Sequence, residues 1–141
     1  MQRWIIAAGI LLVLVVGGGA FAYRTYRQNR PIHAVLLQLQ ISPDAAPSEQ
    51  ATTLKAVMQK LREPALLTRA SKEAGLTKKL QFATDEAAAN DLGKRLFAEL
   101  GEADTPKGRM PVINIGFNCK VKEFNTMTEV SQHLNQTLKK P

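Results

Sequence analysis

The chain of 141 residues has one cysteine and two histidines, and this scarcity excludes several kinds of site. Cys119 has no second cysteine with which to form an internal disulfide, and a lone cysteine with two distant histidines lacks the spacing of a metal site. His33 and His133 also have no neighbours that would complete a catalytic triad. We expect both histidines to be structural, and Cys119 to be a small buried residue at a strand end, with an intermolecular disulfide as its alternative role.

The sequence also lacks the motifs of common enzymes. No two carboxylates are placed as a general acid and base. The glycine triplet Gly17-Gly18-Gly19 precedes no nucleotide-binding helix, so a phosphate-binding loop is excluded by context. The sequence therefore predicts a protein that is not an enzyme and has no catalytic residue, cofactor or metal ion.

Acidic residues are outnumbered, and the formal net charge is +7. Most of the basic residues alternate with acids, as on solvated helix faces. The segment from Lys107 to Lys122 is different, because it holds four basic residues and no acid. Aromatic residues that would stack on bases do not interleave with them, so nucleic-acid binding is disfavoured. Anionic lipid or an acidic polymer is the better match.

The first feature that is present is an uncharged run from Ile5 to Ala22, eighteen residues long. A run of this length predicts a transmembrane helix. Trp4 precedes it and Tyr23 follows it, as aromatic residues do at membrane interfaces. Arg24, Arg27 and Arg30 follow at a spacing that places them on one helix face, within reach of lipid headgroups. The residues expected to span the membrane include Ile5, Ile6, Leu11, Leu12, Val16, Gly18 and Ala22.

A cleaved signal peptide is the alternative interpretation of this run. Arg3 would be its charged start, and Ala20-Phe21-Ala22 would be its cleavage site. The protein would then be a small secreted domain that begins after Ala22. Two features favour retention: the run is longer than the apolar part of most signal peptides, and Arg24 follows the cut at once.

The remaining chain predicts one small α+β domain. We expect residues 1–30 to form the transmembrane anchor with its basic flank, and residues 31–141 to form the domain. Strands are predicted at 31–41 and 110–117, and helices begin near Ser48, Pro64, Thr84 and Thr126. The segment 96–100 is a further strand candidate, and 101–108 is predicted as a turn or hairpin loop. The predicted fold is a transmembrane helix followed by a sheet of two to four strands covered by helices, in the order β-α-α-(β)-β-α.

The segment from Leu61 to Leu76 resembles a motif of the polysaccharide chain-length determinants, the Wzz-type co-polymerase family. In that family a leucine and a proline precede a valine-leucine pair, a basic helix and a glycine-leucine pair. The matching residues here are Leu61, Pro64, Leu67, Gly75 and Leu76. The family also places a proline and an alanine at the start of its first strand, which correspond to Pro31 and Ala34. The resemblance covers about residues 1–138.

The resemblance implies a function without catalysis. Members of the family oligomerise around a polymerase and do not act by their own catalysis. This chain would be a minimal relative, because it lacks the long helices and the second transmembrane helix of the family. It implies contacts with membrane lipid and with a polysaccharide polymerase or glycosyltransferase complex, and a homo-oligomer is a further possibility. The domain would lie outside the cytoplasm at the inner (cytoplasmic) membrane, although the basic flank after the apolar run favours the opposite orientation. The alternative is an unrelated single-pass scaffold protein of the cell envelope.

Overall fold

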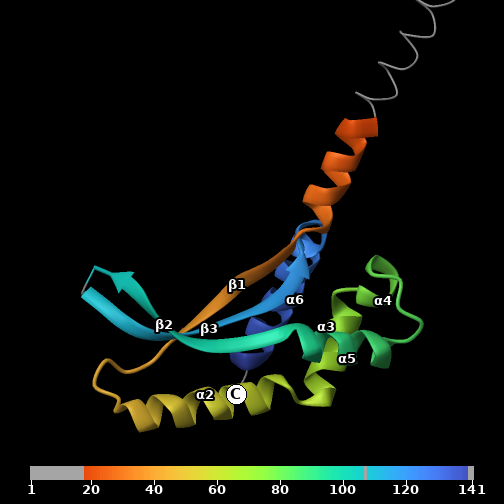
Figure 1. The fold of residues 1–141 in the computed structure, drawn as a ribbon. Coiled ribbons are helices and arrows are strands. Elements are labelled where there is room, and N and C mark those ends of the chain that lie inside the picture. The colour runs from red at the N-terminus through yellow and green to blue at the C-terminus, as the bar shows by residue number, and fades with distance from the viewer. Residues whose placement is uncertain (1–17, 107, 140–141) are drawn as a thin grey trace, which may run out of the picture.

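The structure is a computed structural model that describes residues 18–106 and 108–139. It has an α+β architecture in which a helix over 18–29 precedes a sheet and its helices (Figure 1). The elements that follow are β1 (Pro31–Gln40), α2 (Pro47–Leu61), α3 (Pro64–Glu73), α4 (Leu76–Lys79), α5 (Asp85–Arg95), β2 (Leu96–Thr105), β3 (Gly108–Lys120), the 3-10 helix η1 (Val121–Glu123) and α6 (Phe124–Lys139).

The predicted fold is wrong in its first element. None of the helices in the described ranges is both long and apolar enough to cross a membrane. The described part of the first helix, residues 18–29, carries Arg24 and Arg27. Gly18 and Ala22 lie in this helix, whereas Trp4, Ile5, Ile6, Leu11, Leu12 and Val16 lie outside the described residues.

The predicted element order is also wrong. The helix that was predicted to begin near Thr84 is present as α5, but the four-residue helix α4 between α3 and α5 has no counterpart in the order β-α-α-(β)-β-α. The optional strand is a full element of ten residues, β2. It continues through the segment that was predicted as a loop, because Gly101 to Thr105 pair with Val112 to Gly108 in a long β-hairpin. Cross-strand hydrogen bonds outweigh the turn-like composition of this segment.

The sheet has three antiparallel strands in the order β1-β3-β2. The central strand β3 pairs with β1 from Pro31↔Lys120 to Gln40↔Val112, with a register shift between Val35 and Leu37. Such an irregularity in an edge strand discourages pairing with a further strand. The strand predicted at 110–117 is confirmed as part of β3, and its side chains alternate: Ile113, Ile115 and Phe117 are buried in the core while Asn114 lies on the other face.

Local signals set the helix boundaries where the sequence predicted them in several places. Thr84 caps α5, since its hydroxyl accepts a hydrogen bond of 3.1 Å from the Ala87 N–H. Pro64 begins α3, where its missing N–H costs nothing. Gly75 follows α3 in the left-handed conformation, with φ of 65°. The helices predicted to begin near Ser48 and Thr126 begin one and two residues earlier, at Pro47 and Phe124, so neither Ser48 nor Thr126 caps its helix.

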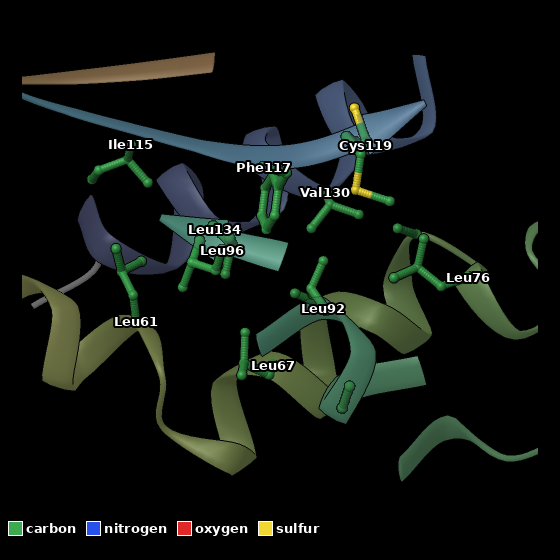
Figure 2. Packing of buried hydrophobic residues seen from close by; sticks show 14 of the residues in the cluster. Leu61, Leu67, Leu76, Leu92, Leu96, Ile115, Phe117, Cys119, Val130 and Leu134 are labelled. Atoms are coloured by element: carbon green, nitrogen blue, oxygen red, sulfur yellow. The ribbon is translucent and has the colours of Figure 1, made fainter. Parts of the chain in front are cut away.

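One hydrophobic core joins the sheet to its helices (Figure 2). Phe117 of β3 is 1% exposed and points toward Leu92 of α5 and Val130 of α6. Leu61 at the end of α2 and Leu67 of α3 close the core on the side of these helices. Full burial of each large side chain contributes roughly 2 kcal/mol, so this shared cluster is what holds the helices on one face of the sheet.

Candidate functional site

The residues that carry the family resemblance are mainly structural. Ala34, Leu61, Leu67 and Leu76 are buried in the core. Pro64 begins α3, Gly75 provides a left-handed backbone conformation, and Pro31 begins β1. These positions therefore specify the packing of α3 and β1, and a binding surface must be sought in the exposed residues around them.

A groove lies between α3 and α5, with a volume of about 710 Å³. Pro64 and Leu67 of α3 and Ala89 and Gly93 of α5 provide its apolar part. Gly93 allows the two helices to approach, because a Cβ atom there would lie 3.1 Å from Cδ1 of Leu67. This close approach explains why a glycine that costs about 1 kcal/mol of helix stability stands in the middle of α5.

The rim of the groove is polar and carries charges of both signs. Glu86, Asn90 and Lys94 line it at four-residue spacing, so they form one exposed stripe of α5. Thr68 lines it from α3, and Arg62 lines it from the end of α2. An apolar floor with a few polar groups around it is the usual composition of a binding groove, and the volume lies in the usual range.

These rim residues were missed by the sequence interpretation. The stripe of Glu86, Asn90 and Lys94 is visible in the sequence as the polar side of an amphipathic helix. Such a side is most often only solvated, and the sequence gives no sign that α3 packs beside it. Only the tertiary contact between α3 and α5 converts the stripe into one wall of a groove.

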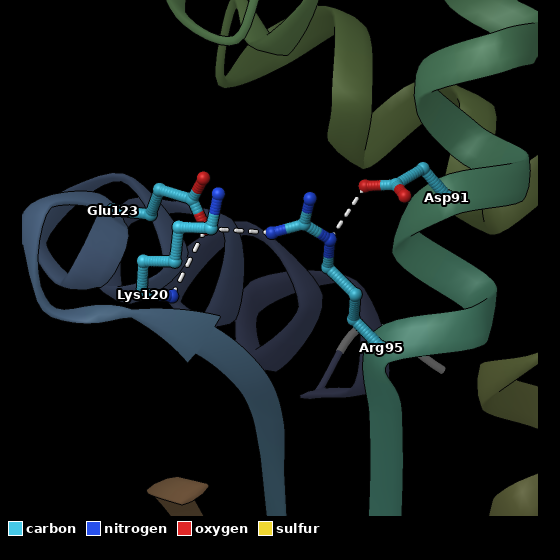
Figure 3. A network of polar contacts seen from close by, with 4 residues as sticks. All are labelled: Asp91, Arg95, Lys120 and Glu123. Carbon is cyan, nitrogen blue, oxygen red and sulfur yellow. Dashed lines mark hydrogen bonds and ion pairs between the residues drawn. The ribbon is translucent and has the colours of Figure 1, made fainter. Parts of the chain in front are cut away.

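A polar network locks the end of α5 to the turn after β3 (Figure 3). The Arg95 guanidinium donates to Glu123 at 2.7 Å and pairs with Asp91 at 2.6 Å. The Glu123 carboxylate also accepts a 3.0 Å hydrogen bond from the Lys120 backbone N–H. Burial alone would raise the pKa of the Glu123 carboxyl, but the Lys120 N–H and the Arg95 guanidinium outweigh it, and the net shift is downward. The network therefore stabilises the ionised carboxylate of Glu123, and its role is structural.

Cys119 is buried, as predicted, and faces the helices from the end of β3. Burial, and then the nearby Glu123 carboxylate, raise the pKa of its thiol, which disfavours the reactive thiolate. This environment matches a packing role and not a nucleophile.

The histidines also have structural contacts. His33 stacks on the Phe97 ring with 3.5 Å between ring centroids, and its Nδ1 lies 2.7 Å from Oδ1 of Asn118. His133 on α6 lies 3.2 Å from the Glu73 carboxylate. Across residues 18–106 and 108–139, no three of the His, Cys, Asp and Glu side chains form a group that could hold a metal ion.

The residues expected at a membrane interface lie in the first described helix and just after it. Tyr23, Arg24 and Arg27 are exposed on the helix over 18–29, and Arg30 is exposed at the junction with β1. Trp4 lies outside the described residues.

Comparisons of the chain with family models, with curated proteins and with solved structures find no match.

Proposed function

We propose that this chain is a non-enzymatic interaction module of polysaccharide assembly or export, and that a partner polypeptide binds the groove between α3 and α5. The partner would belong to a polysaccharide polymerase or glycosyltransferase complex. The observation that carries the proposal is the groove itself, with its apolar floor and its rim of mixed charge.

The resemblance to chain-length determinants supports the cellular process. The segment Leu61–Leu76 that carries it contributes both Pro64 and Leu67 to the groove. The first strand, which the resemblance places at Pro31 and Ala34, is present as β1 and pairs with β3. By the same resemblance we propose that the protein works at the inner (cytoplasmic) membrane, with residues 31–141 outside the cytoplasm.

The mixed charge of the rim indicates how a partner would be recognised. Arg62 and Lys94 favour a carboxylate on the partner, and Glu86 favours a cation further along it. Rim charges of this kind mainly set association rate and specificity, while the apolar floor supplies affinity. A partner helix or extended segment with one apolar anchor and flanking charges would match the groove.

The proposal is tested with a groove-blocking variant and a matched control. Asn90→Trp places a large side chain in the groove, and Thr52→Trp places the same side chain at an exposed position of α2. We expect gene deletion and Asn90→Trp to change the amount or length distribution of surface polysaccharide on gels, whereas Thr52→Trp should leave both unchanged. Both variants should retain the melting temperature of the unmodified chain.

Two results would contradict the proposal. Deletion of the gene with no change in polysaccharide amount or length would exclude the process. Equal effects of Asn90→Trp and Thr52→Trp would exclude the groove. A photo-cross-linking residue at position 90 adds a direct measurement, because it should capture a polymerase or glycosyltransferase subunit that mass spectrometry identifies.

A further inference from the structure

A second surface lies at the end of the domain from which the helix over 18–29 projects (Figure 1). Here the turn after β3 meets the start of β1, because the Val121 N–H donates a 3.1 Å hydrogen bond to the Arg30 carbonyl. The contact brings together two segments that are 91 residues apart in the sequence, by the difference between positions 121 and 30. We call the residues of these two segments the basic end: Tyr26, Arg27 and Arg30 come from the first segment, and Lys120, Val121, Lys122 and Phe124 from the second.

Three apolar or aromatic side chains of the basic end are exposed. Tyr26 is 74% exposed, and Val121 and Phe124 are each 40% exposed. Phe124 is the first residue of α6, whose apolar residues Met127, Val130 and Leu134 are buried. Phe124 therefore differs from the other apolar residues of α6, because it is exposed, as Val121 is in the preceding turn.

The charge of the basic end has one sign. Arg27, Arg30 and Lys122 form no ion pair with a carboxylate of the described residues. The one acid within the turn, Glu123, is 8% exposed, and its carboxylate is bound by Arg95 and by the Lys120 backbone N–H. The network of Figure 3 therefore withdraws the negative charge from this surface and leaves the cations exposed.

We propose that the basic end docks on the surface of a bilayer that contains anionic lipid. Cationic side chains are attracted to the headgroup phosphates, while tyrosine, phenylalanine and valine insert into the boundary between headgroups and acyl chains. A valine beside a phenylalanine suits this apolar boundary better than the base-stacking surface of a nucleic-acid site. The inference rests on the proposed membrane location, and it is independent of the groove and its partner.

A fluorescence experiment on the full chain tests this docking. The sequence has one tryptophan, Trp4, so a chain with Trp4→Phe and Phe124→Trp carries a single reporter at the basic end. The reporter is measured in reconstituted vesicles with brominated acyl chains, either purely zwitterionic or containing phosphatidylglycerol. We expect quenching to be about twofold stronger in the anionic vesicles, and to lose this excess at about 0.5 M salt, where charges are screened within a few ångströms.

Charge variants separate the basic end from the net charge of the protein. Lys122→Glu in the reporter chain should reduce quenching in anionic vesicles to the zwitterionic level. Lys55→Glu makes the same change at an exposed position of α2 and should leave quenching unchanged. Circular dichroism identifies a variant that fails to fold, and Lys122→Gln then replaces Lys122→Glu.

Three results would overturn the inference. These are equal quenching in the two kinds of vesicle, equal effects of the two lysine variants, and release of the reporter from anionic vesicles by an oligonucleotide at matched phosphate concentration. None of them bears on the polysaccharide readout of the Asn90→Trp variant, so this inference and the groove proposal fail independently.

Discussion

The two faces of the sheet differ in what they contribute. The face toward the helices presents Ile113, Ile115 and Phe117 of β3, each at most 2% exposed. The opposite face presents Asn114 and Asn118 of the same strand, which bond polar side chains of β1. Val112 shares the side of Asn114 and is 1% exposed, so this face is polar around Asn114 and Asn118 but not throughout. Because the core cluster lies on the helix-covered face, we expect most of the stability to come from that face.

The open face still has an organised structure. His33 of β1 stacks on Phe97 of β2 and lies 3.6 Å from Glu99. On the central strand, Asn118 lies beside His33, and Asn114 accepts a 2.9 Å hydrogen bond from Gln38. These contacts link all three strands, but they are exposed to water, and each cross-strand pair is worth only about 0.2 to 1 kcal/mol. The comparison predicts very unequal effects of substitution on the two faces.

Phe117→Ala should have the largest effect. It removes a fully buried ring from the centre of the helix-covered face and leaves a cavity between β3, α5 and α6. We expect the free energy of unfolding, measured in urea, to fall by about 4 kcal/mol. Asn118→Ala, one residue along on the open face, is the matched control and should cost less than about 1 kcal/mol. Similar losses for the two variants would contradict the proposed division between the faces.

Gly116→Ala should have the next largest effect. A Cβ atom at this position would lie 1.9 Å from the Ala34 carbonyl oxygen and 2.7 Å from Cζ of Phe97. The Ala34 carbonyl is part of the backbone and cannot rotate away as a flexible side chain can, so the added methyl group would force β1 away from β3. We expect a loss of about 3 kcal/mol by urea unfolding. Gly93→Ala is the matched control, because its new methyl group meets only the end of the Leu67 side chain, and it should not be destabilising beyond about 1 kcal/mol.

Much of the secondary structure could be predicted from local signals. Pro64, Gly75 and Thr84 each act within one turn of the chain, and the alternation from Ile113 to Phe117 defines a face of β3. A hairpin loop was predicted at 101–108, but the extension of the two strands through most of this segment could not be predicted, because the pairing of 101–105 depends on β3. Arg109, which lies 3.7 Å from Glu102 and 3.4 Å from Asp104, makes cross-strand pairs that no local pattern reveals.

The candidate surfaces were still less predictable. The groove needs α3 beside α5, and the basic end needs Val121 beside Arg30, and both contacts join distant parts of the sequence. Charge counting also missed Glu123, which lies one residue beyond a segment without acids and is sequestered by Arg95. The predicted membrane helix rested on composition over 5–22, and none of the helices in the described ranges is long and apolar enough to cross a membrane.

Glu123→Gln should have an intermediate effect that depends on pH. The variant keeps an acceptor for the Lys120 N–H but loses the charge that binds Arg95, so we expect a loss of about 2 kcal/mol at pH 7. Because folding lowers the pKa of Glu123, its stabilisation is complete above the ordinary value of 4.5 and is lost as the pH falls through the lower folded value. The difference between the two chains should therefore shrink below about pH 4. A difference that is constant from pH 7 to pH 3 would show that the charge on Glu123 contributes no stability.

His33→Ala should have the smallest effect of the four, and it examines the open face alone. The change removes the stack on Phe97 and the contact with Asn118, while the half-exposed ring leaves no cavity in the core. We expect a loss of about 1 kcal/mol by urea unfolding, since an aromatic pair contributes about 0.5 to 1.5 kcal/mol. His33→Phe keeps the stack without the hydrogen bond and should recover most of this loss. If His33→Ala lowered the free energy of unfolding as much as Phe117→Ala, the polar contacts of the open face would stabilise the fold as strongly as the core does. The proposed difference between the two faces would then be wrong.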